Sequence, residues 1–140
     1  MGEGSAKERL FRNPRNPLDT PQEALMTITR HEESKVFAKV VEANGLVFTS
    51  GIVADDSSLD IKGQTRQTLA EIDRLLALAG TDKSKIVSTM IWVTDIRNRD
   101  AMNEVWFEWT GGQNMPVRAR VEARLASPEL LVEIQVTATK

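Results

Sequence analysis

Apolar and polar residues alternate most clearly along two segments near the C-terminus, residues 117–125 and 132–138. The polar positions of the first segment are Arg118, Arg120, Glu122 and Arg124, and those of the second are Glu133, Gln135 and Thr137. A period of two predicts a β-strand with one buried face and one polar face. Ser127-Pro128 lies between the segments and predicts a turn. We therefore expect the two strands to form a hairpin.

The N-terminal half predicts three shorter strands, at residues 26–30, 36–42 and 46–50. Asn44-Gly45 separates the last two and is a strong signal for a two-residue hairpin turn. Gly51 follows the returning strand and indicates a bend or a close approach of the backbone. Farther along, residues 86–94 are rich in β-branched and apolar side chains, which favours a central strand.

Two segments have apolar positions at three- and four-residue steps, the spacing that predicts an amphipathic helix. The first covers residues 61–79 and is followed by a glycine that marks its C-terminal stop. The second begins at Asn98 or Asp100 and ends at Gly111-Gly112. Its apolar face contains two tryptophans, which we interpret as core residues.

The predicted order of elements is βββ-α-β-α-ββ. It indicates an α+β domain of two layers, in which two helices cover one face of a mixed sheet of about six strands. The other face would carry the polar residues Arg118, Arg120, Glu122 and Glu133. Because that face is too charged to be buried in the hydrophobic core of a single subunit, we expect it to lie at the interface of an oligomer. The pattern does not distinguish a dimer from a trimer.

The chain has 140 residues, a length that favours one domain. Residues 1–25 hold three of the five prolines and lack the apolar core of a secretory signal. We interpret them as an N-terminal extension, either flexible or foreign to the native protein, and assign the domain to residues 26–140. No apolar run approaches the roughly 20 residues that cross a bilayer. We expect a cytoplasmic protein that contacts no membrane.

Composition excludes several kinds of chemistry. The chain has no cysteine and no tyrosine, and His31 is its single histidine. Disulfides and thiolate nucleophiles are therefore ruled out, and a zinc site is disfavoured. A serine–histidine triad would depend on His31, which lies in a polar segment that predicts a strand end and a turn. The net charge of -2, with both signs mixed along the chain, offers no basic surface for nucleic acid.

Four polar features lie on or beside the predicted polar face of the sheet: Arg118, Glu133, Ser50-Gly51 and Asn103. The guanidinium of Arg118 offers a planar fork of donors that matches a carboxylate. Glu133 can orient a water molecule or act as its general base. Ser50 and nearby backbone amides can hold the rest of a small ligand. The set suits hydrolysis of a small anion without a metal or a covalent nucleophile.

An ion pair between Arg118 and Glu133, worth roughly 0.2–1 kcal/mol, is the simpler interpretation, and spacing alone favours it. The register of the predicted hairpin argues against it. A turn at Ser127-Pro128 places Glu133 opposite Glu122, with Arg118 roughly 13 Å farther along the strand. The two charges would then meet at a bulge or across a subunit boundary.

Several motifs resemble the RidA/YjgF/UK114 family. The similarity runs from Lys35 to the C-terminus. The motifs that carry it are residues 44–51 (NGLVFTSG), 64–69 (QTRQTL), 116–121 (PVRARV) and 132–134 (VEI). The Pro-x-Arg strand followed by the Glu-Ile strand is the most specific part.

The resemblance implies a chorismate-mutase-like (YjgF-like) fold and a homotrimer with clefts between its subunits. It also implies hydrolytic deamination of reactive 2-imino and 2-enamino acids, such as 2-iminopropanoate and 2-iminobutanoate, to 2-oxo acids and ammonia. The activity implied is that of a 2-iminobutanoate/2-iminopropanoate deaminase, which uses no cofactor.

The resemblance also implies roles for individual residues. Arg118 corresponds to the arginine that binds the substrate carboxylate, and Glu133 to the glutamate that positions the attacking water. Ser50 and Gly51 correspond to residues that line the cleft. Asn103 matches an asparagine near the cleft.

Two departures from the family pattern affect the expected cleft. Arg120 stands where many members have cysteine, at a position whose backbone carbonyl is thought to help place water. Phe37 stands where typical members have tyrosine, so a hydroxyl group is missing. Phe37, together with a connection from Trp106 to Arg118 that is shorter than in typical members, indicates a divergent subgroup and leaves the identity of the substrate open.

Two other functions compete with the deaminase. A non-catalytic binder of small carboxylates such as 2-oxo acids, acting as a regulator, would use the same arginine. An endoribonuclease or translation inhibitor is less consistent with the sequence, because the negative net charge and the single histidine offer little for phosphodiester chemistry or base stacking.

Overall fold

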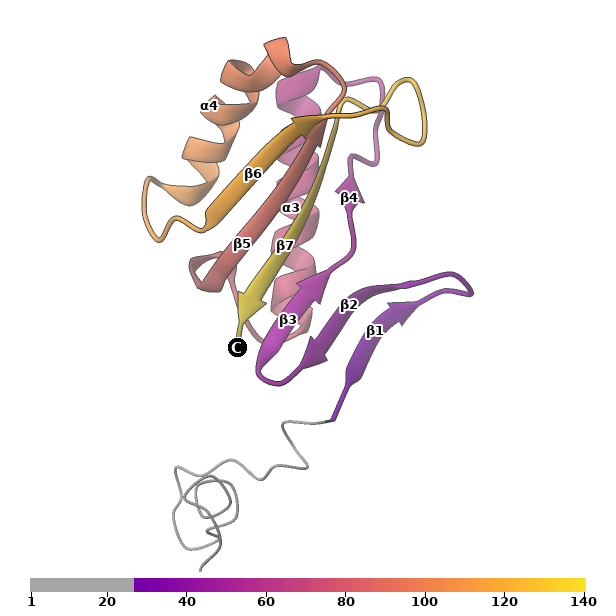
Figure 1. Ribbon diagram of the computed structural model, residues 1–140, viewed down its shortest axis with the longest axis vertical. Coiled ribbons are helices and arrows are strands. Elements are labelled where there is room, and N and C mark those ends of the chain that lie inside the picture. Colours follow the sequence, from indigo (N-terminus) through magenta and orange to yellow (C-terminus); the bar gives the residue numbers. More distant parts are fainter. Residues whose placement is uncertain (1–26) are drawn as a thin grey trace, which may run out of the picture.

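The computed structural model describes residues 27–140, which form one sheet with two helices on one of its faces (Figure 1). The sheet has seven strands in the order β1-β2-β3-β7-β5-β6, and the short β4 also pairs with β7. The predicted α+β class is confirmed.

The proposed extension at residues 1–25 lies outside the described residues. The strands are β1 (Thr29–Glu33), β2 (Ala38–Ala43), β3 (Leu46–Thr49), β4 (Ile52–Val53), β5 (Ile86–Val93), β6 (Val117–Glu122) and β7 (Val132–Thr139). The helices are α3 (Ile61–Leu78) and α4 (Arg99–Thr110), and the 3-10 turns are η1 (Lys83–Lys85) and η2 (Ile96–Asn98).

Strands β1, β2 and β3 form two consecutive antiparallel hairpins. Asn44 and Gly45 have φ angles of 53° and 75°, the left-handed conformation that a tight two-residue turn requires. The first strand covers residues 29–33, whereas residues 26–30 were predicted. Its pairing with β2 runs from Thr29 opposite Glu42 to Glu33 opposite Ala38. His31 therefore lies within a strand and not at a turn.

Strand β5 is central, as predicted, but it separates the two strands that we expected to form a hairpin. β6 pairs with β5 in parallel, and β7 pairs with the other edge of β5 in the antiparallel direction. The predicted hairpin around Ser127-Pro128 is therefore wrong. Helix α4 returns the chain to the start of β5, so β6 must run parallel to it. The connection after β6 then crosses to the far edge of β5 (Figure 1).

This pairing places the polar side chains of β6 and β7 on opposite faces of the sheet. Arg118 is in register with Thr89 and Arg120 with Ile91, which are 3% and 0% exposed beneath the helices. Glu133 is in register with Trp92, which alternates with those buried positions and therefore faces the open side. The expectation that Arg118, Arg120, Glu122 and Glu133 share one open polar face is wrong, because parallel pairing turns the arginines toward α4.

The two helices match their predicted bounds closely. The Asp60 carboxylate caps α3 by accepting a hydrogen bond of 2.8 Å from the Gly63 amide. Gly111 ends α4 in the left-handed conformation. Both tryptophans of α4 belong to or border the core, as predicted: Trp106 is 6% exposed, and Trp109 packs beside it and donates to Asp73. Neither helix within residues 27–140 has the length and apolarity of a bilayer span.

Gln64, a fully buried polar residue of α3, holds the connection that leads into β7. Its amide nitrogen donates to the carbonyls of Ser57, Leu59 and Glu129 at 2.9–3.2 Å. Its amide oxygen accepts from the Leu131 amide at 2.9 Å. One side chain thus bonds four backbone groups from two separate segments. It fixes the start of β7, and with it the position of Glu133.

Candidate functional site

The residues predicted to form the site fall into two separate groups. Asn103 of α4 joins Arg118 and Arg120 of β6 in what we call the arginine cluster. Phe37, Ser50, Gly51 and Glu133 lie around the short strand β4, and we call them the glutamate group. The two groups lie on opposite sides of β5 in the strand order.

The arginine cluster is built on one amide oxygen. Asn103 Oδ1 accepts a hydrogen bond of 2.9 Å from Nη1 of Arg118 and one of 2.8 Å from Nη1 of Arg120. The ring of Trp106 lies 5.3 Å from the guanidinium carbon of Arg118. Residues 118 and 120 point the same way because they are two apart on a strand. The strand and the helix therefore hold the two arginines in defined positions.

Neither arginine of the cluster forms an ion pair within residues 27–140. The Nε atom of Arg120 is shielded from solvent and has no hydrogen-bond partner there. Partial burial, and secondly the charge of Arg120, lower the pKa of the Arg118 guanidinium from its ordinary value. A guanidinium is still charged at neutral pH. The cluster therefore offers two positive charges to an anion.

In the glutamate group, the carboxylate of Glu133 occupies the space beside the backbone of Gly51. A methyl group on Gly51 would lie 2.0 Å from Oε2 of Glu133, well inside contact distance. Within the described chain the carboxylate of Glu133 makes no hydrogen bond or ion pair, and the shielded hydroxyl of Ser50 has no partner. These polar groups are thus free to bind water or a ligand.

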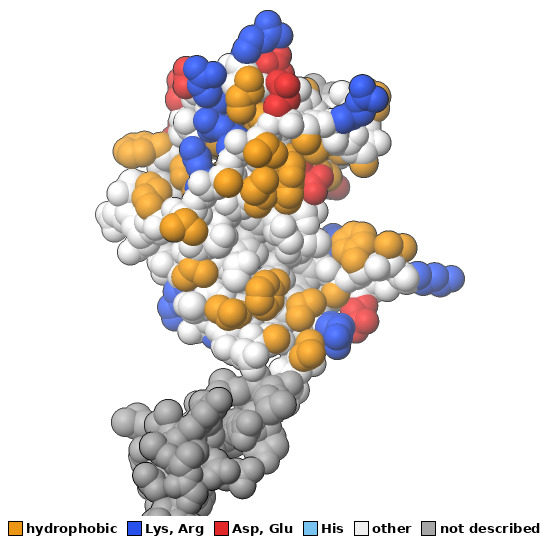
Figure 2. Space-filling view, viewed as in Figure 1, with side chains coloured by type: hydrophobic (Ala, Val, Ile, Leu, Met, Phe, Trp, Pro, Cys, Tyr) orange, Lys and Arg blue, Asp and Glu red, His pale blue; other side chains and the backbone are white. Residues whose placement is uncertain are grey.

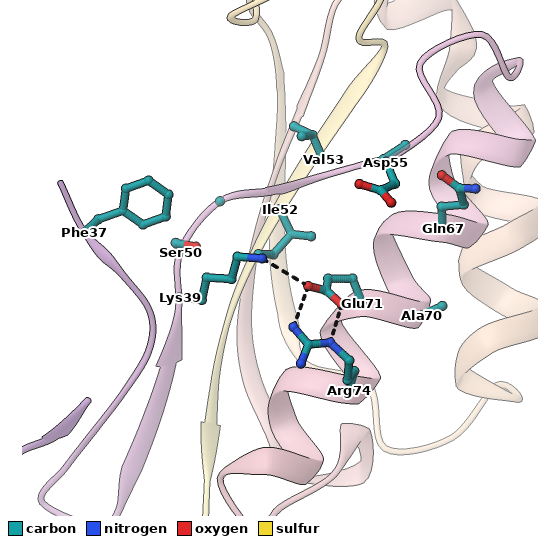
Figure 3. A pocket seen from close by; sticks show the side chains of 12 residues that line it. Phe37, Lys39, Ser50, Ile52, Val53, Asp55, Gln67, Ala70, Glu71 and Arg74 are labelled. Atoms are coloured by element: carbon teal, nitrogen blue, oxygen red, sulfur yellow. Dashed lines mark hydrogen bonds and ion pairs between the residues drawn. The ribbon is translucent and has the colours of Figure 1, made fainter. Parts of the chain in front are cut away.

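A cavity of about 660 Å³ opens next to this group, between β2, β4 and α3 (Figure 3). Its volume is typical of a site for a small molecule. Phe37, Ser50 and Gly51 line it together with the apolar residues Ile52, Val53, Ala54 and Ala70 and the polar residues Lys39, Asp55, Gln67, Glu71 and Arg74. Phe37 is 54% exposed at its margin. Of the residues that line the cavity, only Phe37, Ser50 and Gly51 were predicted from the sequence as site residues. The four- and three-residue steps of Gln67, Glu71 and Arg74, which put them on one helix face, are a signal that could have found them.

Lys39, Glu71 and Arg74, which line the cavity, form a charged network with Glu32 of β1. Arg74 donates two hydrogen bonds to each of two carboxylates, Glu32 at 2.7 and 2.9 Å and Glu71 at 2.7 and 2.9 Å. Figure 3 shows Lys39 and Arg74 both reaching Glu71. The hydrogen bonds from Arg74 lower the pKa of both carboxyl groups. The network ties the first hairpin to α3.

The arginine cluster and the glutamate group do not meet within one chain. Arg118 is in register with Thr89, and Thr89 with Val136, so Glu133 lies three residues away along β7 and on the other face. That offset is roughly 10 Å along the strand alone. No ion pair joins Arg118 and Glu133. The simple ion-pair interpretation is therefore wrong for a single subunit.

His31 and the acidic residues form no recognisable metal site. Within residues 27–140 no group of three or more His, Asp or Glu side chains has suitable geometry. The imidazole of His31 hydrogen-bonds Glu42 at 2.5 Å, and Glu42 also accepts from Lys140 at 2.7 Å. No serine is among the partners of His31, so a serine–histidine triad has no counterpart in the described chain.

Comparisons with known proteins agree with this architecture. The family model described as Endoribonuclease L-PSP matches residues 27–140. A RutC family protein of Haemophilus ducreyi is 41% identical over 79% of this chain and 95% of its own length. A solved YjgF-family structure from Neisseria meningitidis has a TM-score of 0.80 and 40% identity, covering 83% of this chain and 97% of that one. A YjgF/YER057c/UK114 family member from Mycobacterium tuberculosis has a TM-score of 0.75 and 31% identity, covering 81% of this chain and 100% of that one. The chain therefore belongs to the RidA/YjgF/UK114 family.

Proposed function

We propose that the protein hydrolyses 2-imino and 2-enamino acids to 2-oxo acids and ammonia. The observation that carries the proposal is the arginine cluster, in which Arg118 is positioned by Asn103 and Trp106 and lacks a carboxylate partner in the described chain. An α-carboxylate is the natural partner for such a guanidinium. The resemblance to the family implies the same reaction, and two of the relatives described above are named as RutC and YjgF family proteins.

The reaction needs little machinery beyond placement. The imine carbon is electrophilic, so a water molecule near Glu133 adds to it while the carboxylate accepts a proton from that water. Transfer of that proton to nitrogen gives a carbinolamine. A second proton then moves from its hydroxyl group to the nitrogen as the carbon–nitrogen bond breaks, which yields the 2-oxo acid and ammonia. Fixing the substrate through Arg118 supplies orientation, which can contribute several kcal/mol.

The active site in this proposal is shared between subunits of a homotrimer. Within one chain Arg118 and Glu133 are separated by β5, so each subunit would supply half of two different sites. The open sheet face is the surface available for assembly. Its exposed apolar residues include Phe48, Val117 and Val121, at 38%, 71% and 41%, and Figure 2 shows hydrophobic side chains gathered over this face. Burying such a patch against other copies would stabilise the assembly.

Replacing Arg118 tests its role in substrate binding. We expect Arg118→Ala to lower kcat/KM for 2-iminopropanoate, made in situ by an amino-acid oxidase, by at least about a hundredfold, because the carboxylate loses its charged partner. Arg124→Ala removes an exposed arginine just beyond β6 and serves as the matched control. Full activity of Arg118→Ala with an unchanged melting temperature would rule out the role.

Mixed oligomers test whether the site is shared. Arg118→Ala and Glu133→Gln should each be inactive alone. Unfolded together and refolded, they should recover about a quarter of the wild-type sites if subunits mix at random, because some interfaces then combine an intact arginine with an intact glutamate. A mixture that stays inactive, although its subunits have exchanged, would place both residues in the same subunit's site.

A non-catalytic carboxylate binder remains the competing function, because Phe37 at the cavity margin offers no hydroxyl group. That protein would bind pyruvate in an Arg118-dependent manner and would not speed the loss of any imine. Ribonuclease activity has less support despite the description of the matching family model. The single histidine is engaged with Glu42 and its side chain is only 22% exposed.

A further inference from the structure

Arg120 adds a second positive charge to the arginine cluster. Both Nη1 atoms bond the same oxygen of Asn103, so they lie within about 6 Å of each other. A neutral amide oxygen cannot balance two guanidinium charges. Like charges this close are held together here by their positions on one strand and their shared bonds to Asn103, and an anion would relieve their repulsion.

Three carboxylates lie close to the arginine cluster along β6 and α4, and none of them forms an ion pair with Arg118 or Arg120. Glu122, two residues beyond Arg120, accepts from the Ile96 amide at 3.0 Å. Glu104, next to Asn103, pairs with Lys62. Asp100 in the first turn of α4 makes no ion pair with either arginine. The remaining contact of Arg120 is a long one of 3.5 Å to the Arg99 carbonyl. The described chain thus supplies no counter-ion.

The spacing of the two guanidinium groups suits a ligand with two carboxylates better than a ligand with one. The two oxygens of one carboxylate are satisfied by the fork of a single guanidinium, which leaves the second arginine without an anion. A dicarboxylate of four or five carbons separates its charges by roughly 4–6 Å, which matches the spacing of the two arginines. The indole of Trp106 covers one face of Arg118, so its donor edge is the side left for the ligand.

We propose that Arg120 is a second anion anchor and that the site prefers 2-imino acids whose side chain ends in a carboxylate, the imines of aspartate- and glutamate-type amino acids. This inference rests on the proposed deaminase function, and it names the substrate class. The reaction is unchanged: water replaces the imine nitrogen, and ammonia leaves. Arg118 holds one carboxylate and Arg120 the other.

Equilibrium binding of stable 2-oxo acids tests the preference without any turnover. We expect 2-oxoglutarate to bind the wild-type protein at least about tenfold more tightly than pyruvate in calorimetry. Arg120→Met keeps the packing of the stem and removes the charge, so it should abolish this difference by lowering the affinity for 2-oxoglutarate much more than that for pyruvate. Arg120→Lys should retain part of the preference, and Arg124→Ala all of it.

Three results would overturn the inference: equal affinities of the wild-type protein for the two acids, equal losses for both acids in Arg120→Met, or no loss for either. Equal losses would mean that Arg120 acts only by positioning Asn103. Kinetics with imines made in situ from glutamate and alanine separate this inference from the proposed function. Selective binding without hydrolysis of either imine refutes the deaminase alone. Hydrolysis with a kcat/KM ratio that Arg120→Met leaves unchanged refutes the second anchor alone.

Discussion

Gly51 is the residue that allows Glu133 to stand where it does. Its φ angle is not in the left-handed region, so its conformation does not require glycine. The requirement is space, because an added methyl group would overlap the Glu133 carboxylate. Glycine usually weakens a strand, so a glycine in an extended segment often marks a position where another group lies close to the backbone.

Gly51→Ala should therefore move the Glu133 carboxylate and leave the fold intact, because the overlapping atoms are the end of a flexible side chain. We expect kcat/KM for 2-iminopropanoate to fall by about tenfold or more, with a melting temperature within a few degrees of wild type. In a Glu133→Gln background the same glycine substitution should cost little further activity. An equal loss in both backgrounds would show that Gly51 acts independently of Glu133.

Asn103 accepts hydrogen bonds from both arginines, and its amide is neutral. A negative charge at this position would therefore compete with a bound anion. Asn103→Asp places a carboxylate on the same atoms. We expect the melting temperature to rise by roughly 2–5 °C, because the new ion pairs are partly exposed and modest. Affinity for pyruvate should fall at least about tenfold, because the built-in carboxylate competes with the ligand.

Asn98→Asp is the matched control for that substitution. It adds the same charge at the N-terminus of the same helix, where it should favour α4 and leave binding unchanged. Unchanged pyruvate affinity in Asn103→Asp, measured by calorimetry, would contradict the assignment of the cluster as the carboxylate site.

At the scale of elements, the network around Arg74 sets how the first hairpin lies against α3. β1 pairs only with β2, so its other contacts come from side chains such as Glu32. The bidentate bonds from Arg74 to Glu32 and Glu71 join the two layers beside the cavity. The position of Phe37, which follows the turn of this hairpin, therefore depends on α3.

Arg74→Gln should lower the melting temperature in a pH-dependent way. The folded-state pKa values of Glu32 and Glu71 lie below their ordinary value of 4.5. Their contribution to stability is therefore fully present above about pH 4.5 and is lost as the pH falls through the lowered values. Circular dichroism should show the largest difference from wild type near pH 7 and a shrinking one toward pH 3.

Arg66→Gln is the control on the same helix, because Arg66 and Glu108 are 3.9 Å apart and both are exposed. Its effect should be small at every pH. A pH-independent difference between Arg74→Gln and wild type would instead assign the stabilisation to packing of the arginine stem.

For the whole molecule, the decisive feature is that the polar side of β6 faces α4 and its apolar side faces outward. Val121 is in register with Trp92 on the open face, and Val117 is the more exposed of the two valines at 71%. Apolar side chains on the open side of an edge strand favour association with another copy. In the proposed trimer, the same arrangement would leave each chain with two half-sites.

Val121→Glu should break the assembly without unfolding the subunit. We expect sedimentation velocity to show monomers for this variant and the proposed trimer for the wild type, and imine hydrolysis to be lost although Arg118 and Glu133 remain. Val36→Glu is the control, since Val36 is 86% exposed at the tip of the first hairpin. A fully active monomeric Val121→Glu variant would exclude a site shared between subunits.

Much of the fold followed from local patterns along the chain. The spacing of apolar residues placed both helices, and the Asn44-Gly45 turn placed the β2–β3 hairpin, because these signals arise from neighbouring residues. The candidate residues themselves, Arg118 and Glu133 among them, were also identified from residue type and family resemblance. Cavity residues such as Lys39 and Asp55 were not, because they come from segments that only packing brings together.

By itself, the sequence determined that β6 and β7 each have a polar and an apolar side. A period of two cannot say which side meets the helices. Only the tertiary structure decided this, because β5 lies between the two strands and its parallel pairing with β6 turns Arg118 and Arg120 toward Asn103. Strand order depends on contacts between distant segments, and it separates the arginine cluster from Glu133.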